Sequence, residues 1–255
     1  MIDWLFHLPV AWMAMVIFGA TYLIAAAICW GTTRLGLKGK VIEPAMLSPL
    51  GIVFGLLVVF TASQVWGDLD RAKRAVSAEA SALRTVVLLT DDLPKDEAAS
   101  LRALISQHIE NAVSEEWPAM EQGRASLERP PAKLSEALQK TLTLPTTDDT
   151  QKIVQREIVS ALNNAFEARR ERIVISHSNV NSVKWIGLLV TGLCVLIATA
   201  LTHLDNRRNC GIALALFATG MAVSLLMIAS HSRPFTGEIS IDPHLLLQVA
   251  PIASP

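Results

Sequence analysis

The sequence predicts an all-α membrane protein with four transmembrane helices, the second and third of which extend into a long extramembrane helical bundle. Of its 255 residues, 51% are hydrophobic and 18% are charged, an apolar balance above that of a typical soluble domain. Four stretches lack charged residues for about 20 positions or more, which at about 1.5 Å per residue crosses a hydrocarbon core of about 30 Å. A polar block with helical spacing and little strand pattern separates the second stretch from the third.

The uncharged stretches are interpreted as four membrane spans. They cover residues 4–33, 44–67, 185–204 and 209–232. A charge at the centre of a span would cost about 2.5–3.5 kcal/mol, so the absence of charge is informative. Tryptophans stand near the ends of these stretches, as in the aromatic belt at a membrane surface: Trp12, Trp30, Trp66 and Trp185. The acidic start, Met1-Ile2-Asp3, predicts a retained first span rather than a cleaved signal peptide.

Residues 68–184 are predicted to form one helical block. Apolar residues recur every three or four positions over residues 68–93, so the second span continues as an amphipathic stalk that Pro94 ends. A second helix is expected over residues 96–117 and a short one near 132–142. Residues 147–184 contain no Gly or Pro, which predicts that this stalk and the third span form a single helix of roughly 50 residues or more.

The segment after the fourth span, HSRPFTGEISIDP, is predicted to act as a tether. Pro234 cannot donate a backbone hydrogen bond and disfavours a helical Arg233, so the span should end here. Ile239 and Ile241 alternate with polar residues, which predicts a short strand or extended segment after a turn at Thr236-Gly237. We expect Phe235, Ile239 and Ile241 to dock against the stalks. The residues of this structural tether are Arg233, Pro234, Phe235 and Gly237.

The chain is therefore expected to divide into four segments. They are residues 1–67 (first two spans), 68–184 (stalks and hairpin), 185–232 (last two spans) and 233–255 (tail). The short loops at 31–44 and 205–208 are basic, and such loops favour the cytoplasm. This predicts a protein of the cell (inner) membrane with its helical block on the extracytoplasmic side. Basic residues at the membrane ends of the stalks oppose that orientation, but long loops count less in the rule.

Neutral polar residues are the candidates for a pore lining. No span carries a central acid or base, which argues against a proton pump. Thr61, Ser63 and Gln64 cluster in the last turns of the second span, where they could line a pore or form hydrogen bonds between helices. Four nearby charges could form a vestibule: Asp68, Asp70, Arg169 and Arg170. The charge run over residues 167–172 is otherwise interpreted as a solvated face of the stalk.

Other classes of function find little support in the sequence. Cys29, Cys194 and Cys210 are an odd number of cysteines in or beside apolar runs, which predicts free thiols rather than disulfides or a zinc site. A net charge of −1 provides no general attraction to nucleic acid. Ser, His and Asp occur without a recognisable spacing of nucleophile and base. We therefore predict no catalytic residue, no metal, no cofactor and no enzymatic activity.

An ordered set of short motifs carries a family resemblance across nearly the whole chain. The motifs are Trp66-Gly67-Asp68 before Arg71-Ala72, Glu79-Ala80 with Leu83, Glu116-Trp117-Pro118, Ala168-Arg169-Arg170 and Pro234-Phe235-Thr236-Gly237. With four spans and a long helical insert, they resemble the bacterial bestrophin-like membrane proteins, a family defined by a domain of unknown function. The resemblance implies kinship with bestrophins, which are oligomeric anion channels.

Two functions follow as hypotheses. The first is an ion channel of bestrophin-like type, a homo-oligomer in membrane lipid that conducts an inorganic ion. The alternative is a non-enzymatic scaffold or sensor whose helical bundle binds a partner while the spans anchor it. A more distant analogy is the proton-channel subunit of the flagellar stator, which also has four spans and a large insert after the second.

Overall fold

The computed structural model of the protein describes residues 6–35, 43, 45, 47–145 and 148–250. Within these residues it is helical and contains no strand, and four helices are long and apolar enough to cross a membrane. The chain forms two compact units, and each is considered by itself. Unit 1 comprises residues 1–67, 179–233 and 237–239, and unit 2 comprises residues 68–178, 234–236 and 240–255.

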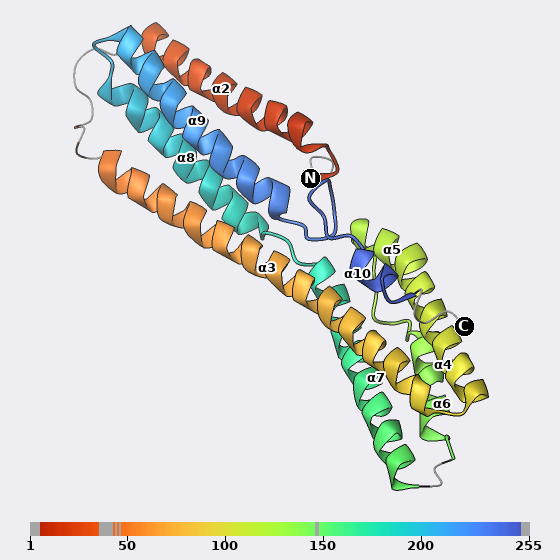
Figure 1. The fold of residues 1–255 in the computed structure, drawn as a ribbon. Coiled ribbons are helices and arrows are strands. Elements are labelled where there is room, and N and C mark those ends of the chain that lie inside the picture. The colour runs from red at the N-terminus through yellow and green to blue at the C-terminus, as the bar shows by residue number, and fades with distance from the viewer. Residues whose placement is uncertain (1–5, 36–42, 44, 46, 146–147, 251–255) are drawn as a thin grey trace. The chain divides into compact units, whose positions relative to one another are not determined.

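Unit 1 contains the membrane-spanning helices. They are α2 (Val10–Arg34), the first half of α3 (Leu47–Leu89), α8 (Ser182–Thr202) and α9 (Arg207–His231). Helices α2, α8 and α9 pack against one another (Figure 1). The ring centroids of Phe54 on α3 and Phe217 on α9 are 5.8 Å apart. Gly192 lies where α8 approaches α9, because a Cβ atom there would come within 2.5 Å of Met221 Cε.

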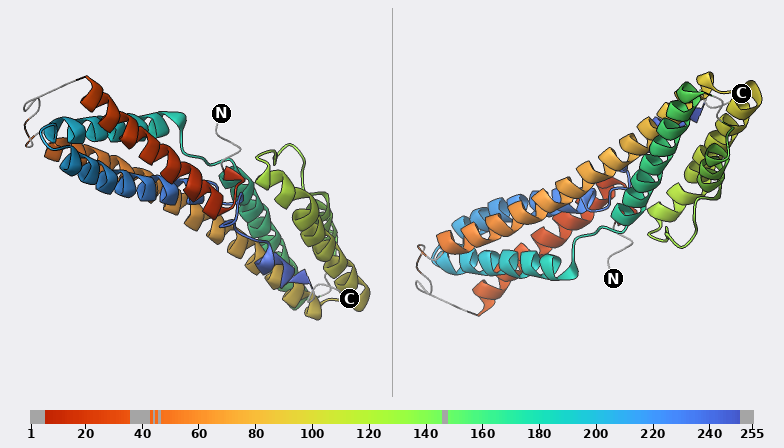
Figure 2. Two further views of the ribbon diagram at one scale, coloured as in Figure 1. Left: turned by 90° about the horizontal axis from the view of Figure 1, so that it is seen from above. Right: turned by 90° about the horizontal axis from the view of Figure 1, so that it is seen from below.

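Unit 2 contains the rest of α3 and several helices beyond the membrane. They are η2 (Thr90–Asp92), α4 (Lys95–Asn111), η3 (Ala112–Glu116), α5 (Trp117–Glu121), α6 (Ala132–Leu142), α7 (Asp149–Ser176) and α10 (His244–Leu247). The views in Figure 2 show α7 beside the second half of α3, with α4 beside α6. The apolar faces of α3, α4, α6 and α7 meet in one core. Apolar burial at helical spacing therefore accounts for the bundle.

The predicted single helix of about 50 residues is wrong. Helix α7 ends at Ser176, and residues 177–181 separate it from α8. This segment is rich in Ser and Asn, whose side chains compete for backbone hydrogen bonds. Asn181 caps α8, since its side-chain oxygen accepts a hydrogen bond from the Val183 N–H at 3.0 Å.

Proline 118 changes the shape of a helix without ending it. Residues 112–116 form a π-helical turn, and the helix then continues through Pro118 to Glu121. Because proline lacks an N–H, it cannot donate to the carbonyl one turn earlier, and a widened turn relieves the mismatch. Gly123, with a φ of 64°, ends this region with a hydrogen bond from its N–H to the Met120 carbonyl.

The end of the fourth span is confirmed, whereas the strand, one of the two forms predicted for the segment after it, does not occur in the described residues. Helix α9 ends at His231, just before Arg233 and Pro234. The tail then forms turns, with Gly237 at a φ of 90°, which lead into the short helix α10. A Cβ atom at Gly237 would lie 3.0 Å from the Phe6 carbonyl oxygen, which together with the φ explains the glycine.

Each unit holds part of the tail through its own contacts. In unit 2 the rings of Phe235 and Trp117 meet edge to face at 5.8 Å, and the Thr236 hydroxyl donates to the Glu121 carbonyl at 2.9 Å. In unit 1 the Arg233 guanidinium lies 4.7 Å from the Phe6 ring centroid. Ile241 packs against the core of unit 2, whereas Ile239 is 41% exposed. Phe235 therefore contacts Trp117 of α5 and belongs to the same buried core as residues of the two stalk helices.

Replacement of Phe235 tests the tail contact. Because Phe235 is buried against Trp117, we expect Phe235→Ala to destabilise unit 2 by about 3–5 kcal/mol, as buried Phe→Ala changes generally do. Truncation after Arg233 removes Phe235 and the whole of α10, and should destabilise it further. Thermal unfolding in detergent and limited proteolysis would measure both effects. The exposed Ile239→Ala is the control, and an unchanged midpoint for Phe235→Ala would contradict the assignment.

Candidate functional site

The three predicted pore residues point in different directions from α3. Thr61 is buried within unit 1, and its hydroxyl donates to the Leu57 carbonyl at 2.7 Å. Gln64 is half-buried, and its side-chain oxygen accepts a hydrogen bond from the Lys184 ammonium. Ser63 is exposed. Of the three, only Ser63 lies on the uncovered face of the helix.

That uncovered face is a continuous apolar stripe along the membrane-spanning half of α3. Its members recur every three or four residues and are 49–68% exposed: Ile52, Leu56, Val59 and Phe60. Positions at this spacing share one side of a helix, and Ser63 continues the series. Phe54 and Val65 lie on the opposite side and are buried in the core of unit 1. We call Ile52, Leu56, Val59, Phe60 and Ser63 the lining stripe.

The same helix presents a polar exposed face after its apolar part. Asp68 is its first charged residue, and in unit 2 the exposed positions Asp70, Arg74 and Ser77 follow at helical spacing. Among the four apolar helices that the structure describes, α3 alone continues as one helix beyond its uncharged segment. One element therefore offers an apolar surface and then a polar one.

A buried ionic cluster joins three helical segments of unit 2. The Arg172 guanidinium on α7 donates from Nε to Glu79 Oε2 at 2.6 Å and from Nη2 to Glu79 Oε1 at 3.1 Å. The same Nη2 donates to Glu116 Oε2 at 2.8 Å. The side chains of Arg172 and Glu79 are fully buried. This two-point geometry is the strong form of an arginine–carboxylate pair.

Neighbouring side chains complete the cluster. His108 Nε2 on α4 lies 3.3 Å from Glu79 Oε1, and the Arg169 guanidinium binds Glu116 Oε1 at 2.7 Å. Arg172 also lies 4.7 Å from the Trp117 ring centroid, and its Nη1 is 3.5 Å from Met120 Sδ. The π-helical turn before Trp117 brings Glu116 and Trp117 to Arg172 together.

The charges in this cluster stabilise one another. Burial alone would raise the pKa of the Glu79 carboxyl, but the Arg172 charge and the hydrogen bonds from His108 and Arg172 outweigh it, and the pKa falls from 4.5 to about 2. Burial alone would lower the pKa of Arg172, whereas Glu79 and Glu116 raise it above its ordinary value. Both side chains are therefore ionised at neutral pH, as a structural ion pair requires.

The cluster is arranged for structure rather than for chemistry on a substrate. Each guanidinium nitrogen of Arg172 already has a partner within the protein. Among the residues that the structure describes, no group of three or more His, Cys, Asp or Glu side chains could hold a metal ion. We therefore assign the cluster to holding α3, α4, η3 and α7 in place.

The structure corrects the solvated-face interpretation of the charge run on α7. Arg169 and Arg172 are buried in the ionic cluster, whereas Arg170 is exposed and lies 3.9 Å from Glu167. Of the other predicted vestibule charges, Asp70 is exposed. Asp68 is buried and paired with Arg71, one turn along the helix. Asp70 and Arg170 are therefore exposed, whereas Asp68 and Arg169 are buried, each with its own partner.

Sequence reasoning missed the roles of Glu79, Glu116 and Arg172. A signal was available for Glu79, because it stands between the core positions Val76 and Ala80 on an otherwise apolar helix face. A charged residue on such a face is rarely buried without a partner. The pairing itself joins residues 93 positions apart, and no local pattern indicates it.

Replacement of Glu79 tests the cluster by acid unfolding. The folded pKa of about 2 lies below the ordinary 4.5, so the carboxylate contributes stability above pH 4.5, and this contribution is lost as the pH falls toward 2. A shift of this size corresponds to roughly 3 kcal/mol. At pH 7, Glu79→Gln should cost about 3–5 kcal/mol because it leaves Arg172 without its main counter-charge.

The measurement is the thermal unfolding midpoint in detergent between pH 7 and pH 3. The difference between the parent and Glu79→Gln should shrink steadily below pH 4.5. Glu136→Gln, at a glutamate whose side chain is 56% exposed, is the control and should follow the parent curve. Equal stability of the parent and Glu79→Gln at pH 7 would contradict the assigned role.

Comparison with known proteins identifies the fold. A crystal structure of a bacterial bestrophin homologue from Klebsiella pneumoniae matches with a TM-score of 0.71 and 15% identity, covering 94% of this chain and 96% of that one. A single-residue variant of that homologue matches with a TM-score of 0.70 and 15% identity, covering 94% and 97%. No curated protein matches the sequence.

The family assignment rests on the sequence itself. The family model for the Bestrophin-like domain matches residues 19–246, most of the chain. This range includes the lining stripe, the ionic cluster and the tail up to α10. The expected resemblance and the all-helical membrane fold are confirmed. The chain is a multi-pass membrane protein that belongs to the Bestrophin-like family.

Proposed function

We propose that the protein is a subunit of a homo-oligomeric ion channel whose pore is lined by the uncovered face of α3. The observation that carries this proposal is the change along that face from the apolar lining stripe to the polar positions that follow it. A conduit needs a lining within the membrane and a wettable continuation beyond it. Kinship with the bestrophins, which are oligomeric channels, supports the same function.

The lining stripe has the composition of a hydrophobic gate. Several copies of α3 around an axis would form successive rings of Leu56, Phe60 and Ser63 side chains. A narrow apolar ring excludes water until it widens, and an ion cannot cross it without water. A ring of Ser63 hydroxyls at the end of the gate would rehydrate the ion. Thr61 and Gln64 would lie behind this surface, because their side chains already have partners within the unit.

Ion flux into liposomes tests the channel. Purified protein should carry ions across the membrane above the level of empty liposomes, measured with separate dyes for anions and cations. Leu56→Ser should increase flux several-fold because it places a hydroxyl in the proposed apolar ring. Leu23→Ser is the matched control, since Leu23 is exposed on α2 and faces lipid in this arrangement.

The results separate the channel from the alternative function. Flux that rises with Leu56→Ser but not with Leu23→Ser supports a pore at the lining stripe. Equal changes in ion flux for both variants would show that α3 does not line the pore. Absence of flux for the parent and both variants would favour the scaffold or sensor, in which the helical unit binds a partner protein. The side of the membrane that unit 2 occupies stays a prediction.

A further inference from the structure

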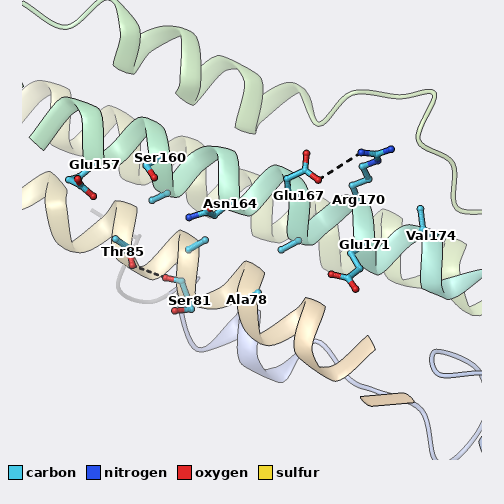
Figure 3. A pocket seen from close by; sticks show the side chains of 13 residues that line it. Ala78, Ser81, Thr85, Glu157, Ser160, Asn164, Glu167, Arg170, Glu171 and Val174 are labelled. Carbon is cyan, nitrogen blue, oxygen red and sulfur yellow. Dashed lines mark hydrogen bonds and ion pairs between the residues drawn. The ribbon is translucent and has the colours of Figure 1, made fainter. Parts of the chain in front are cut away.

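A long groove runs between the second half of α3 and α7 in unit 2. It encloses about 800 Å³ and is open to the surface. Figure 3 shows Thr85 of α3 across from Glu157 and Ser160 of α7, and Ala78 across from Asn164 and Glu167. Much of the lining is small, including Ala82 and Ala161. Small side chains allow another helix to approach closely.

The α7 side of the groove carries acids without partners. Glu157 and Glu171 line the groove and are exposed. Among the residues that the structure describes, neither has an ion-pair partner, in contrast to Glu167, which lies 3.9 Å from Arg170. The two carboxylates are 14 residues apart, about 21 Å along the helix. An occupant with two basic groups at a similar separation would neutralise both.

The side of α3 that faces away from the groove carries two basic residues at a similar separation. Lys73 and Arg84 are exposed, do not line the groove, and have no ion-pair partner within the described part of the chain. At about 100° per residue they lie roughly 120–180° around the helix from Ala78 and Ala82. They are 11 residues apart, about 16 Å, and their long side chains can span the remaining difference. Because this flank and the groove lie on different sides of the same helix, the flank of one chain cannot enter the groove of that chain.

Membrane insertion fixes how two copies can meet. Every copy has the same orientation across the bilayer, so copies in a ring are related by rotation about the membrane normal. Such a rotation keeps each residue at its own height. Thr85 lies across the groove from Glu157 within one chain, and Arg84 is next to Thr85 in the sequence, so the α3 of a neighbouring copy in the groove can bring Arg84 to Glu157. Because α3 and α7 run in opposite directions along the groove, the same placement carries Lys73 toward Glu171.

We propose that this groove is the contact surface for a second copy of the chain, which inserts the Lys73 and Arg84 flank of its α3. Arg84 pairs with Glu157, and Lys73 pairs with Glu171. Since each copy offers a groove on one side and a basic flank on the other, the contact repeats head to tail and closes a ring. The proposal rests on the proposed homo-oligomer and assigns its interface. Exposed pairs of this kind set register and partner choice more than affinity.

Charge reversal tests the pairing. Arg84→Glu and Glu157→Arg should each lower the fraction of oligomer at least about threefold, as measured by native mass spectrometry in mild detergent. The double variant should return that fraction to the parent value because it restores the pair with opposite signs. Arg124→Glu and Glu128→Arg are the matched controls at exposed positions outside the groove. They should leave the oligomer intact.

A cross-linking experiment gives an independent readout. Two differently tagged chains, one with Arg84→Cys and one with Glu157→Cys, would be produced together on a background without the three native cysteines. A short bifunctional reagent should join the two tags, whereas either variant alone should give little product. Thermal unfolding of the single variants would show that they remain folded.

The outcomes distinguish the interface from the function. Rescue in the double variant together with cross-linking between tags establishes the groove as the interface. A stable oligomer with ion flux but no rescue and no cross-link would overturn this interface and leave the channel standing. A monomer that conducts nothing would overturn both proposals. An intact oligomer in both single variants would assign the groove to another occupant, such as a lipid or a peptide, and overturn the inference.

Discussion

The buried pairing of Arg172 with Glu79 and Glu116 is the constraint on which unit 2 depends. A guanidinium inside an apolar core is tolerated only where carboxylates meet it with good geometry. Three segments far apart in the sequence must therefore hold fixed relative positions: α3, the π-helical turn and α7. Trp117 covers the guanidinium, and its indole N–H donates to the Ile241 carbonyl at 3.1 Å. The tail thus depends on the same cluster.

Different sides of helix α3 have different roles. One side buries Val76 and Leu83 in the core and holds Glu79 for the ionic cluster. A second side lines the groove with Ala78 and Ala82. The remaining surface stays uncovered. In the proposed channel, the ionic cluster would stabilise the helix whose other faces contact a neighbour and the ion.

The spans and the helical block could be predicted because their signals are local. Long uncharged runs and proline positions are read directly from the chain, and they correctly predicted that α9 ends just before Pro234. The break after Ser176 was missed because residues 177–181 contain no Gly or Pro, and α8 instead begins at a side-chain cap from Asn181. Arg169 and Arg172 were interpreted as solvated because their partners are 53 to 93 residues away. Thr61, Ser63 and Gln64 were predicted to line a pore together because they are close in the sequence. The helical turn places their side chains on different sides of α3.

The π-helical turn at residues 112–116 has a consequence for reading related sequences. Such a turn behaves as one residue inserted into an α-helix, so it rotates everything after it by about 100°. A relative with one residue fewer at this place could keep both flanking helices, but Glu116 and Trp117 could not both face the arginine. In an alignment, a single-residue gap here would mark relatives with a differently built ionic core, even where every helix is retained.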